Sequence, residues 1–415
     1  MPDQTPSLRR LPRNVWVVTA TSFLTDISSE MLANLIPLFL ANVLKAGTAV
    51  IGLIDGIAET TASLMKVYSG ALSDRLGRRK WLTVLGYGIS TLAKPFLYFA
   101  SSWGWVLGVR FADRMGKGIR TAPRDALVAG SIDEGRRGLA FGLHRAGDTA
   151  GAFLGLLIAA VIIWLTQSGA AALERRTFQI IVLASIIPAA LAVLVLALGA
   201  REVGAAESRT APRLTLKGLD GRFKLFLLVV VLFALGNSSD AFIILRGQER
   251  GLGLLPILGM LMTFNLIYAV LSGPLGALSD RIGRRKLIIA GWIAYGLVYL
   301  GFALAQTGWQ VWTLFGLYGV YYAAAEGTAK ALVADLVTPE RRGAAYGLFN
   351  AAVGLAALPA SVIAGLLWQG AFGWAGFGPA APFYFGAGMA LLAGVLFWRL
   401  IPDKGPGLPG AIGDH

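Results

Sequence analysis

Charged side chains recur inside long apolar stretches of this sequence, where a charge is costly. In the stretch 15–44, Asp26, Glu30 and Asn34 follow one another at intervals of four residues and therefore share one face of a helix. An ionisable group in the core of a bilayer costs at least about 2.5–3.5 kcal/mol on insertion scales, so each one needs a reason. A carboxyl group removed from water favours its protonated form, which suits it to take up and release protons.

The stretch 104–131 carries a basic stripe in place of an acidic one. Arg110, Arg114 and Lys117 follow a spacing of three to four residues and cannot face lipid. Within the predicted helices of the first half, eight basic and seven acidic residues nearly balance, so mutual ion pairing is the first interpretation of the stripe and an open anion site is the second. The residues that we expect to bind substrate or protons are Asp26, Glu30, Asp55, Glu59, Arg110, Asp113, Arg114, Arg145, Asp148, Asp240 and Glu326.

A polar, basic segment occurs twice in the chain. It reads GALSDRLGRRK over residues 70–80 and GALSDRIGRRK over residues 276–286. Each copy lies between two long apolar runs, which indicates a tight cytoplasmic turn between two membrane helices. The repeat, half a chain length apart, indicates two similar halves.

This repeated segment resembles motif A of the major facilitator superfamily. The resemblance implies an all-α membrane protein with twelve transmembrane helices in two pseudo-symmetric halves of six, working by alternating access. It implies that Asp74 lies beside the start of the eleventh helix and that Arg78 joins a charge network at the end of the fourth. The gating residues that it implies are Gly70, Asp74, Arg75, Gly77, Arg78, Gly276, Asp280, Arg281, Gly283 and Arg284.

The composition is that of a polytopic membrane protein. Hydrophobic residues make up 56% of the chain and charged residues 14%, against about 25% charged in soluble domains. The absence of cysteine excludes disulfides and thiolate chemistry, and two histidines cannot build a multi-imidazole metal site. The net charge of +14 lies mainly in predicted cytoplasmic loops, which is the positive-inside pattern and not a nucleic-acid footprint. We expect no cofactor, no bound metal and no nucleic-acid partner, and a monomer in the bilayer.

Twelve apolar runs are each long enough to span a bilayer, which needs about 20 residues. We expect an N-terminal half over 1–200, a cytoplasmic linker over 201–222, a C-terminal half over 223–402 and a cytoplasmic tail over 403–415. Both termini are expected in the cytoplasm and the chain in a bacterial plasma (inner) membrane. The runs are 15–44, 50–69, 82–101, 104–131, 138–165, 177–200, 223–245, 252–275, 287–306, 309–336, 343–370 and 378–402.

Two weaker resemblances bear on the direction of transport and on the substrate. Gly147, Gly151 and Gly155 resemble motif C of facilitator antiporters, which is associated with export, although ordinary glycine packing explains the same pattern. Asp26-Ile-Ser-Ser-Glu30, together with Asp113 and Arg114, resembles the bacterial nickel-resistance exporters. The histidine-rich tail of many such exporters is replaced here by a tail with a single histidine.

These observations predict a secondary active transporter, with proton-coupled export of a drug-like compound, a metal ion or a metal chelate. No nucleotide-binding loop is present, which argues against ATP-driven transport. A membrane-embedded enzyme and a non-transporting sensor are the alternatives; the duplicated turn argues against an enzyme. Glu30 is the leading candidate for the coupling group, and the alternative is that it is an ionised partner of an arginine in the stretch 104–131.

Overall fold

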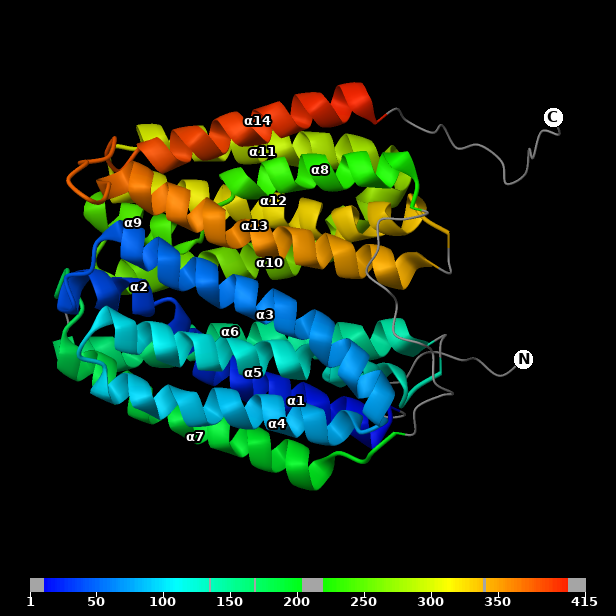
Figure 1. Cartoon of the computed structure of the whole chain (residues 1–415). Helices are drawn as coiled ribbons and strands as arrows, with labels where there is room; N and C mark the ends of the chain where they lie inside the picture. Colours follow the sequence, from blue (N-terminus) through cyan, green and yellow to red (C-terminus); the bar gives the residue numbers. More distant parts are fainter. Residues whose placement is uncertain (1–10, 134–135, 168, 204–218, 339–340, 402–415) are drawn as a thin grey trace.

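The computed structural model describes residues 11–133, 136–167, 169–203, 219–338 and 341–401, and within them the chain is almost entirely helical (Figure 1). The long apolar runs form the helices because a helix satisfies every backbone hydrogen bond within its own segment, which a bilayer demands. Among the described residues, nine helical segments are long and apolar enough to cross a membrane. Helix α5 is not one of the nine, since the basic stripe lies within it.

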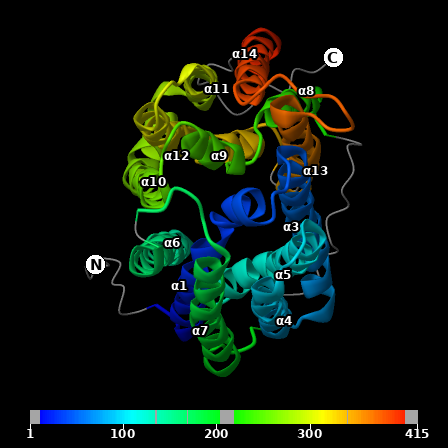
Figure 2. The same ribbon diagram turned by 90° about the vertical axis from the view of Figure 1, so that its left-hand side faces the viewer.

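The first half of the chain forms one group of six spans and the second half forms another, as predicted (Figure 2). The elements of the first group are α1 (Arg13–Ala33), α2 (Ile36–Leu38), η2 (Phe39–Val43), α3 (Thr48–Leu76), α4 (Arg79–Ala93), η3 (Lys94–Phe99), α5 (Trp103–Ala129), α6 (Arg137–Gln167) and α7 (Arg175–Gly199). Those of the second are α8 (Gly221–Gly236), α9 (Ala241–Glu249), α10 (Leu254–Ile282), α11 (Arg284–Leu304), α12 (Gly308–Asp335), α13 (Arg342–Gln369) and α14 (Ala381–Leu400).

Three predicted continuous helices are interrupted in the structure. The run 223–245 splits into α8 and α9, because residues 237–239 are short and polar and Ser239 Oγ accepts the backbone N–H of Ala241. The run 15–44 breaks before Pro37 and ends in a π-helix. The run 82–101 tightens into a 3₁₀ segment at Lys94, where Pro95 follows. Each break places polar or charged residues at an irregular backbone within the bundle.

The bundle has two distinct ends. We call "basic end" the end that carries the start of α1 at Arg13, the turn at Gly77, the turn at Gly283 and the end of α14 at Leu400, on the right in Figure 1. Gly77 has a left-handed backbone with φ of 60° and closes α3 by donating to Ser73. The end with the loops that follow η2, η3 and α9 is the "opposite end".

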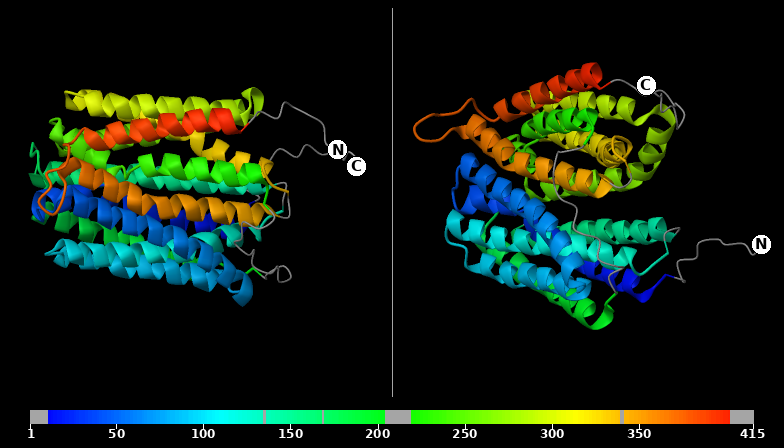
Figure 3. Two further views of the ribbon diagram at one scale, coloured as in Figure 1. Left: turned by 45° about the horizontal axis from the view of Figure 1, so that its top comes forward. Right: turned by 45° about the vertical axis from the view of Figure 1, so that its right-hand side comes forward.

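The two halves meet along α3 with α13 and along α6 with α10 (Figure 2). Glycines allow the α3–α13 contact: a Cβ on Gly56 would lie 2.8 Å from the Cα of Leu358. Hydrogen bonds close the opposite end, from Thr48 Oγ1 to the carbonyl of Gly365 at 3.0 Å and from Gln248 to the carbonyl of Ala171 at 3.0 Å. The helices of the two halves separate toward the basic end (Figure 3).

Candidate functional site

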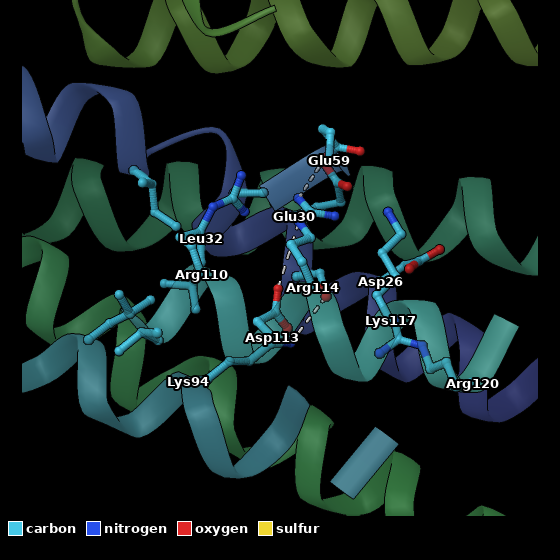
Figure 4. A pocket seen from close by; sticks show the side chains of 15 residues that line it. Asp26, Glu30, Leu32, Glu59, Lys94, Arg110, Asp113, Arg114, Lys117 and Arg120 are labelled. Carbon is cyan, nitrogen blue, oxygen red and sulfur yellow. Dashed lines mark hydrogen bonds and ion pairs between the residues drawn. The ribbon is translucent and has the colours of Figure 1, made fainter. Parts of the chain in front are cut away.

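A cavity of about 150 Å³ lies within the first half, between α1, α3, η3 and α5 (Figure 4). It is walled largely by charged side chains, because α1 and α5 direct their charged faces toward each other and away from the outer surface of the bundle. Its charged lining residues are Asp26, Glu30, Glu59, Lys94, Arg110, Asp113, Arg114, Lys117 and Arg120.

A second cavity of about 410 Å³ lies between the two halves, next to the first. The two share Ala33, Glu59, Arg110 and Arg114. The far wall of this central cavity comes from the interrupted span α8–α9, from α12 and from α13. Its polar residues there are Asn237, Ser238, Ser239, Asp240, Tyr322 and Ser361.

Two arginines of the basic stripe are paired with carboxylates of α3. Arg110 Nη2 lies 2.8 Å from Asp55 Oδ1, and both side chains are less than 10% exposed. The other oxygen of Asp55 accepts a hydrogen bond of 2.9 Å from Ser239, on the opposite half. Arg114 lies 3.5 Å from Glu59, whose side chain is 49% exposed. The ion-pairing interpretation of the stripe therefore holds for these two positions.

Two of the other cations of the first cavity, Lys94 and Arg120, have hydroxyl partners. Lys94 Nζ donates to Ser28 Oγ at 2.7 Å and to Ser29 Oγ at 3.1 Å. Arg120 donates to Ser90 at 3.0 Å and lies over the ring of Tyr87, 4.3 Å from its centroid. Within the part of the chain that the structure describes, no carboxylate oxygen lies within 4 Å of Lys94, Lys117 or Arg120.

The predicted carboxylates of α1 line the same cavity. Glu30 accepts a hydrogen bond of 2.8 Å from Asn34, one turn further along, and no ion pair joins it to an arginine among the described residues. Asp26 lies one turn before Glu30 and also faces the cavity. Asp113 of α5 reaches within 4.0 Å of Arg114. Figure 4 shows Asp26 beside Lys117, and Glu30 beside Arg114.

Asp240 lies on the other side of the central cavity, at the residue before α9. Its Oδ1 is 3.4 Å from the hydroxyl of Tyr318, which also contacts Asn237. Within the described residues no basic nitrogen lies within 4 Å of this carboxylate. The residue is half-buried and lines the central cavity.

Other predicted residues lie outside these two cavities. Arg145 of α6 contacts the hydroxyl of Tyr268 on α10 and so connects the halves. Asp148 lies 3.7 Å from His144, and neither nitrogen of His144 has a hydrogen-bond partner. The side chain of Glu326 lies outside the described residues. The sequence reasoning did not select Lys94, Lys117, Arg120 or Ser239 as site residues, although a lysine and a serine pair within apolar runs are the kind of signal that selected the others.

The motif A segments form the two basic-end turns. Gly77 and Gly283 both have positive φ. Arg79, the first residue of α4, reaches the carbonyl of Ala126 at the end of α5 at 3.5 Å, and Arg284, the first residue of α11, reaches that of Ala331 at 2.9 Å. The arginine that contacts α5 is thus Arg79, next to the expected Arg78. The side chains of Asp74, Asp280 and Arg281 lie outside the described part, so their expected contacts stay predictions.

The motif C-like glycines pack α6 against α1. A Cβ on Gly155 would lie 2.5 Å from the carbonyl oxygen of Ile27, and one on Gly147 would lie 2.7 Å from the side chain of Thr19. Gly151 lies equally close to Phe23. This contact holds in place the helix that carries Asp26 and Glu30, so close packing accounts for these glycines.

No group of three or more histidine, aspartate or glutamate side chains among the described residues is arranged to hold a metal ion. Carboxylate and imidazole clusters are the ligand sets that divalent ions require.

Comparison with known proteins was made on sequence and on structure. The family model of the Major Facilitator Superfamily matches residues 18–262 and 225–414. An uncharacterized MFS-type transporter of Methanocaldococcus jannaschii is 36% identical over 394 residues, which cover 94% of this chain and 95% of that protein. A multidrug resistance protein, MdtG, of Enterobacter lignolyticus is 25% identical over 345 residues, covering 78% and 77%.

The fold is also that of solved transporters. The crystal structure of the nucleoside transporter NupG superimposes with a TM-score of 0.74 at 15% identity, over 94% of this chain and all of that chain. At this identity the likeness shows the fold alone. Together with the family model over both halves and the 36% identical relative, it shows that this chain belongs to the Major Facilitator Superfamily, a family of secondary transporters and not of enzymes.

Proposed function

We propose that this chain is a proton-coupled exporter of a small solute and that it works by alternating access. The observation that carries the proposal is the central cavity, whose walls come from both halves and whose lining combines paired charges with an acidic side chain that has no basic partner. Alternating exposure of a site between two halves is the general mode of such folds. A static structural role would leave no reason for a solute-sized, charged space at mid-depth.

The structure corresponds to the state that is open toward the basic end. Thr48, Gly365, Gln248 and Ala171 hold the halves together at the opposite end, while the helices separate toward the basic end. We assign the basic end to the cytoplasm, because clusters of arginine and lysine in short loops favour that side. The chain then lies in a plasma membrane with both termini in the cytoplasm, and this state is the one that receives solute from the cell.

The moving bodies in this proposal are the two halves. Residues 1–200 and 223–402 each rotate as a unit around the cavity, and the linker 201–222 and the tail 403–415 stay on the cytoplasmic side. Residues 204–218 and 402–415 lie outside the described residues. The turns at Gly77 and Gly283 move with their halves. Arg79, after the first turn, is hydrogen-bonded to α5, and Arg284, after the second, is hydrogen-bonded to α12.

Glu30 is the group to which we assign the coupling proton. Its carboxylate faces the first cavity and has a neutral amide partner, Asn34, so a proton can be added without breaking an ion pair. Protonation at the acidic outside and release into the cytoplasm would alternate with solute binding. Asp55 and Glu59 fit this role less well, because each is already paired with an arginine.

Export of an organic solute fits the comparisons better than export of a metal. The MdtG relative is named a multidrug resistance protein, and no relative reported above is named for a metal. The described residues also offer no cluster of metal ligands. The resemblance to nickel-resistance exporters rests on residues 26–30, on α5 and on Gly147 and Asp148 of α6, and its charged residues Asp26, Glu30, Asp113 and Arg114 line the charged cavity.

Reconstitution of the purified chain into liposomes tests the proposal. A pH gradient, acid outside with respect to the cytoplasmic face, should drive solute uphill from a panel of drug-like compounds, and solute added without a gradient should move protons in the opposite direction. Glu30→Gln should abolish the uphill movement. A chain that moves neither protons nor any solute of the panel would favour a non-transporting sensor.

A further inference from the structure

We propose that the transported solute is an organic monocation, a protonated amine or similar head group on an apolar body, and that Asp240 binds its charge. The inference rests on the proposed function, since it names the substrate class of the same cavity. Three observations support it: the net charge of the cavity lining, the isolation of Asp240 and an aromatic cavity beside it.

Among the described residues, the linings of the first and the central cavity together contain one more acidic than basic side chain. The basic lining residues are Lys94, Arg110, Arg114, Lys117 and Arg120. The acidic lining residues are Asp26, Glu30, Asp55, Glu59, Asp113 and Asp240. With every group ionised, the lining carries one negative charge. An unbalanced charge in a low-dielectric interior is unfavourable, so the cavity favours one added positive charge, a proton in one part of the cycle and a cationic solute in another.

That missing charge is located at Asp240. On the facing wall, Arg110 pairs with Asp55 and Arg114 pairs with Glu59. In the first cavity, Asp26, Glu30 and Asp113 share the lining with as many further cations, Lys94, Lys117 and Arg120, although no direct ion pair joins them. Among the described lining residues of the central cavity, the cations are the paired Arg110 and Arg114, so Asp240 shares that cavity with no cation left over.

Asp240 has no basic nitrogen within 4 Å among the described residues, and its polar contact is the hydroxyl of Tyr318. The charged and titratable groups around it are Asp55 and Glu59 of α3, Arg110 and Arg114 of α5, and Tyr318 and Tyr322 of α12. A cation at this position gains attraction from the carboxylate without displacing an existing ion pair.

A third cavity, of about 320 Å³, adjoins the central one and is suited to an apolar body. Its aromatic lining residues are Phe233, Trp292, Tyr321, Tyr322 and Phe349. Tyr322 and Asn237 line both cavities, so this space continues from the wall that carries Asp240. Apolar walls with a few convergent polar groups are typical of small-molecule sites, and aromatic faces attract cations.

The charges also orient the solute. The described lining residues of the aromatic cavity include no carboxylate, so they offer a cationic head group no counter-charge. The head group therefore lies at Asp240 and the apolar body lies against Tyr322 and its neighbours. An anionic solute would add to the negative charge of the lining, and a neutral one would leave Asp240 without a counter-charge.

Direct binding to the purified full-length chain tests the inference. The probes are two monocations, ethidium and tetraphenylphosphonium, and an anion of similar size, fluorescein. We expect the two cations to bind and fluorescein not to bind. Binding of the cations should weaken as the pH falls from 8 to 6, because protons then supply the positive charge that the cavity lacks.

The variants separate charge from shape. Asp240→Asn should weaken binding of both cations by at least roughly 30-fold, because truncating one member of a buried charge pair has effects of that size. Asp240→Glu keeps the charge and should retain part of the affinity. Asp133→Asn, the same change on an exposed residue of the basic-end loop after α5, is the matched control and should bind as the unaltered chain does.

Two variants of Tyr322 test the aromatic wall of the third cavity. Tyr322→Leu removes the ring and should weaken cation binding by roughly 2- to 30-fold, and Tyr322→Phe, which keeps the ring, should bind the cations more tightly than Tyr322→Leu does. Size-exclusion profiles and melting temperatures show that the variants are folded. If Asp240→Asn binds the cations with unchanged affinity, or if the unaltered chain binds neither cation, the inference is wrong. Gradient-driven flux of an anionic or neutral solute in the liposome assay would then leave the proposed function intact.

Discussion

Ser239 of one half donates a hydrogen bond of 2.9 Å to Asp55 of the other half. The same carboxylate receives Arg110 at 2.8 Å on its second oxygen, so one buried group connects α3, α5 and the interrupted span α8–α9. The hydroxyl that makes the contact exists at this place because residues 237–239 leave the helix. Any rotation of the halves that opens this wall must break that bond. Asp55 is therefore the point at which an ion pair within one half meets a contact between the halves.

The contributions of Asp55 and Arg110 to the free energy of unfolding should depend strongly on each other. Asp55→Asn or Arg110→Gln alone leaves one buried charge without its partner, and each should lower the free energy of unfolding by about 3 kcal/mol. The double variant should recover most of that loss. Denaturant unfolding in detergent micelles, analysed as a double-mutant cycle, measures the coupling.

The Glu59–Arg114 pair is the comparison: at 3.5 Å and with Glu59 half exposed, it should couple by about 1 kcal/mol or less. Equal coupling energies for the two pairs would contradict this account.

Contacts at the opposite end should block transport when they are made permanent. Gln248 donates to the carbonyl of Ala171 across the two halves, and the chain has no native cysteine. The pair Ala171→Cys and Gln248→Cys, joined by a short thiol cross-linker, should hold the bundle in the state described here and stop liposome flux. Reduction of a cleavable cross-linker should restore it. Each single cysteine treated in the same way is the control, and full flux in the cross-linked pair would show that the opposite end does not open.

The glycine stripe of α6 should be sensitive to a single methyl group where it touches α1. Gly155→Ala places a Cβ 2.5 Å from the carbonyl oxygen of Ile27 and should lower the melting temperature by several degrees, because neither backbone has room to move. Gly142→Ala, on the same helix, has nothing within 4 Å of the new Cβ and should be neutral or stabilising. Similar melting temperatures for the two variants would mean that α1 and α6 pack loosely.

The sequence predicted the helices well because each span is a long apolar run, and it placed the two halves because one segment is repeated. It did not predict the interruption at residues 237–239, since a serine pair within an apolar run fits a helix as readily as a break. The sequence also could not predict which charged residues of the site pair with one another. Spacing shows which residues share a face of one helix, whereas the partners of Arg110 and Lys94 depend on how α3, α5 and α1 are placed by glycine contacts such as Gly118 against Ala62.

The motif A turns should matter for the transport rate and not for folding. Asp74→Asn should slow flux severely without preventing membrane insertion, and Asp280→Asn should do so more mildly. The expectation rests on the family resemblance, in which a carboxylate at this turn is favoured by a helix N-terminus, typically by about 0.3–1 kcal/mol. Flux and surface expression should be measured together for both variants. Unaltered flux in both variants would show that these turns serve only to set the orientation of the helices in the membrane.

Glu30 and Asp240 should prove to have separate roles. Glu30 accepts from Asn34 in the first cavity, whereas Asp240 lies on the far wall of the central one. If Glu30 carries the coupling proton, Glu30→Gln removes the group that responds to the gradient and leaves the carboxylate that binds the solute. Uphill transport should then be abolished while downhill exchange continues.

Asp240→Asn should abolish both movements, because the solute is no longer bound. The two variants are compared in the same liposomes, with solute exchange measured at equal pH on both sides and uphill flux measured with an acid exterior. Loss of both activities and of thermal stability in Glu30→Gln would identify Glu30 as a structural partner within the charged cavity. In that case Arg114→Gln, which removes the nearby guanidinium shown in Figure 4, should restore part of the stability.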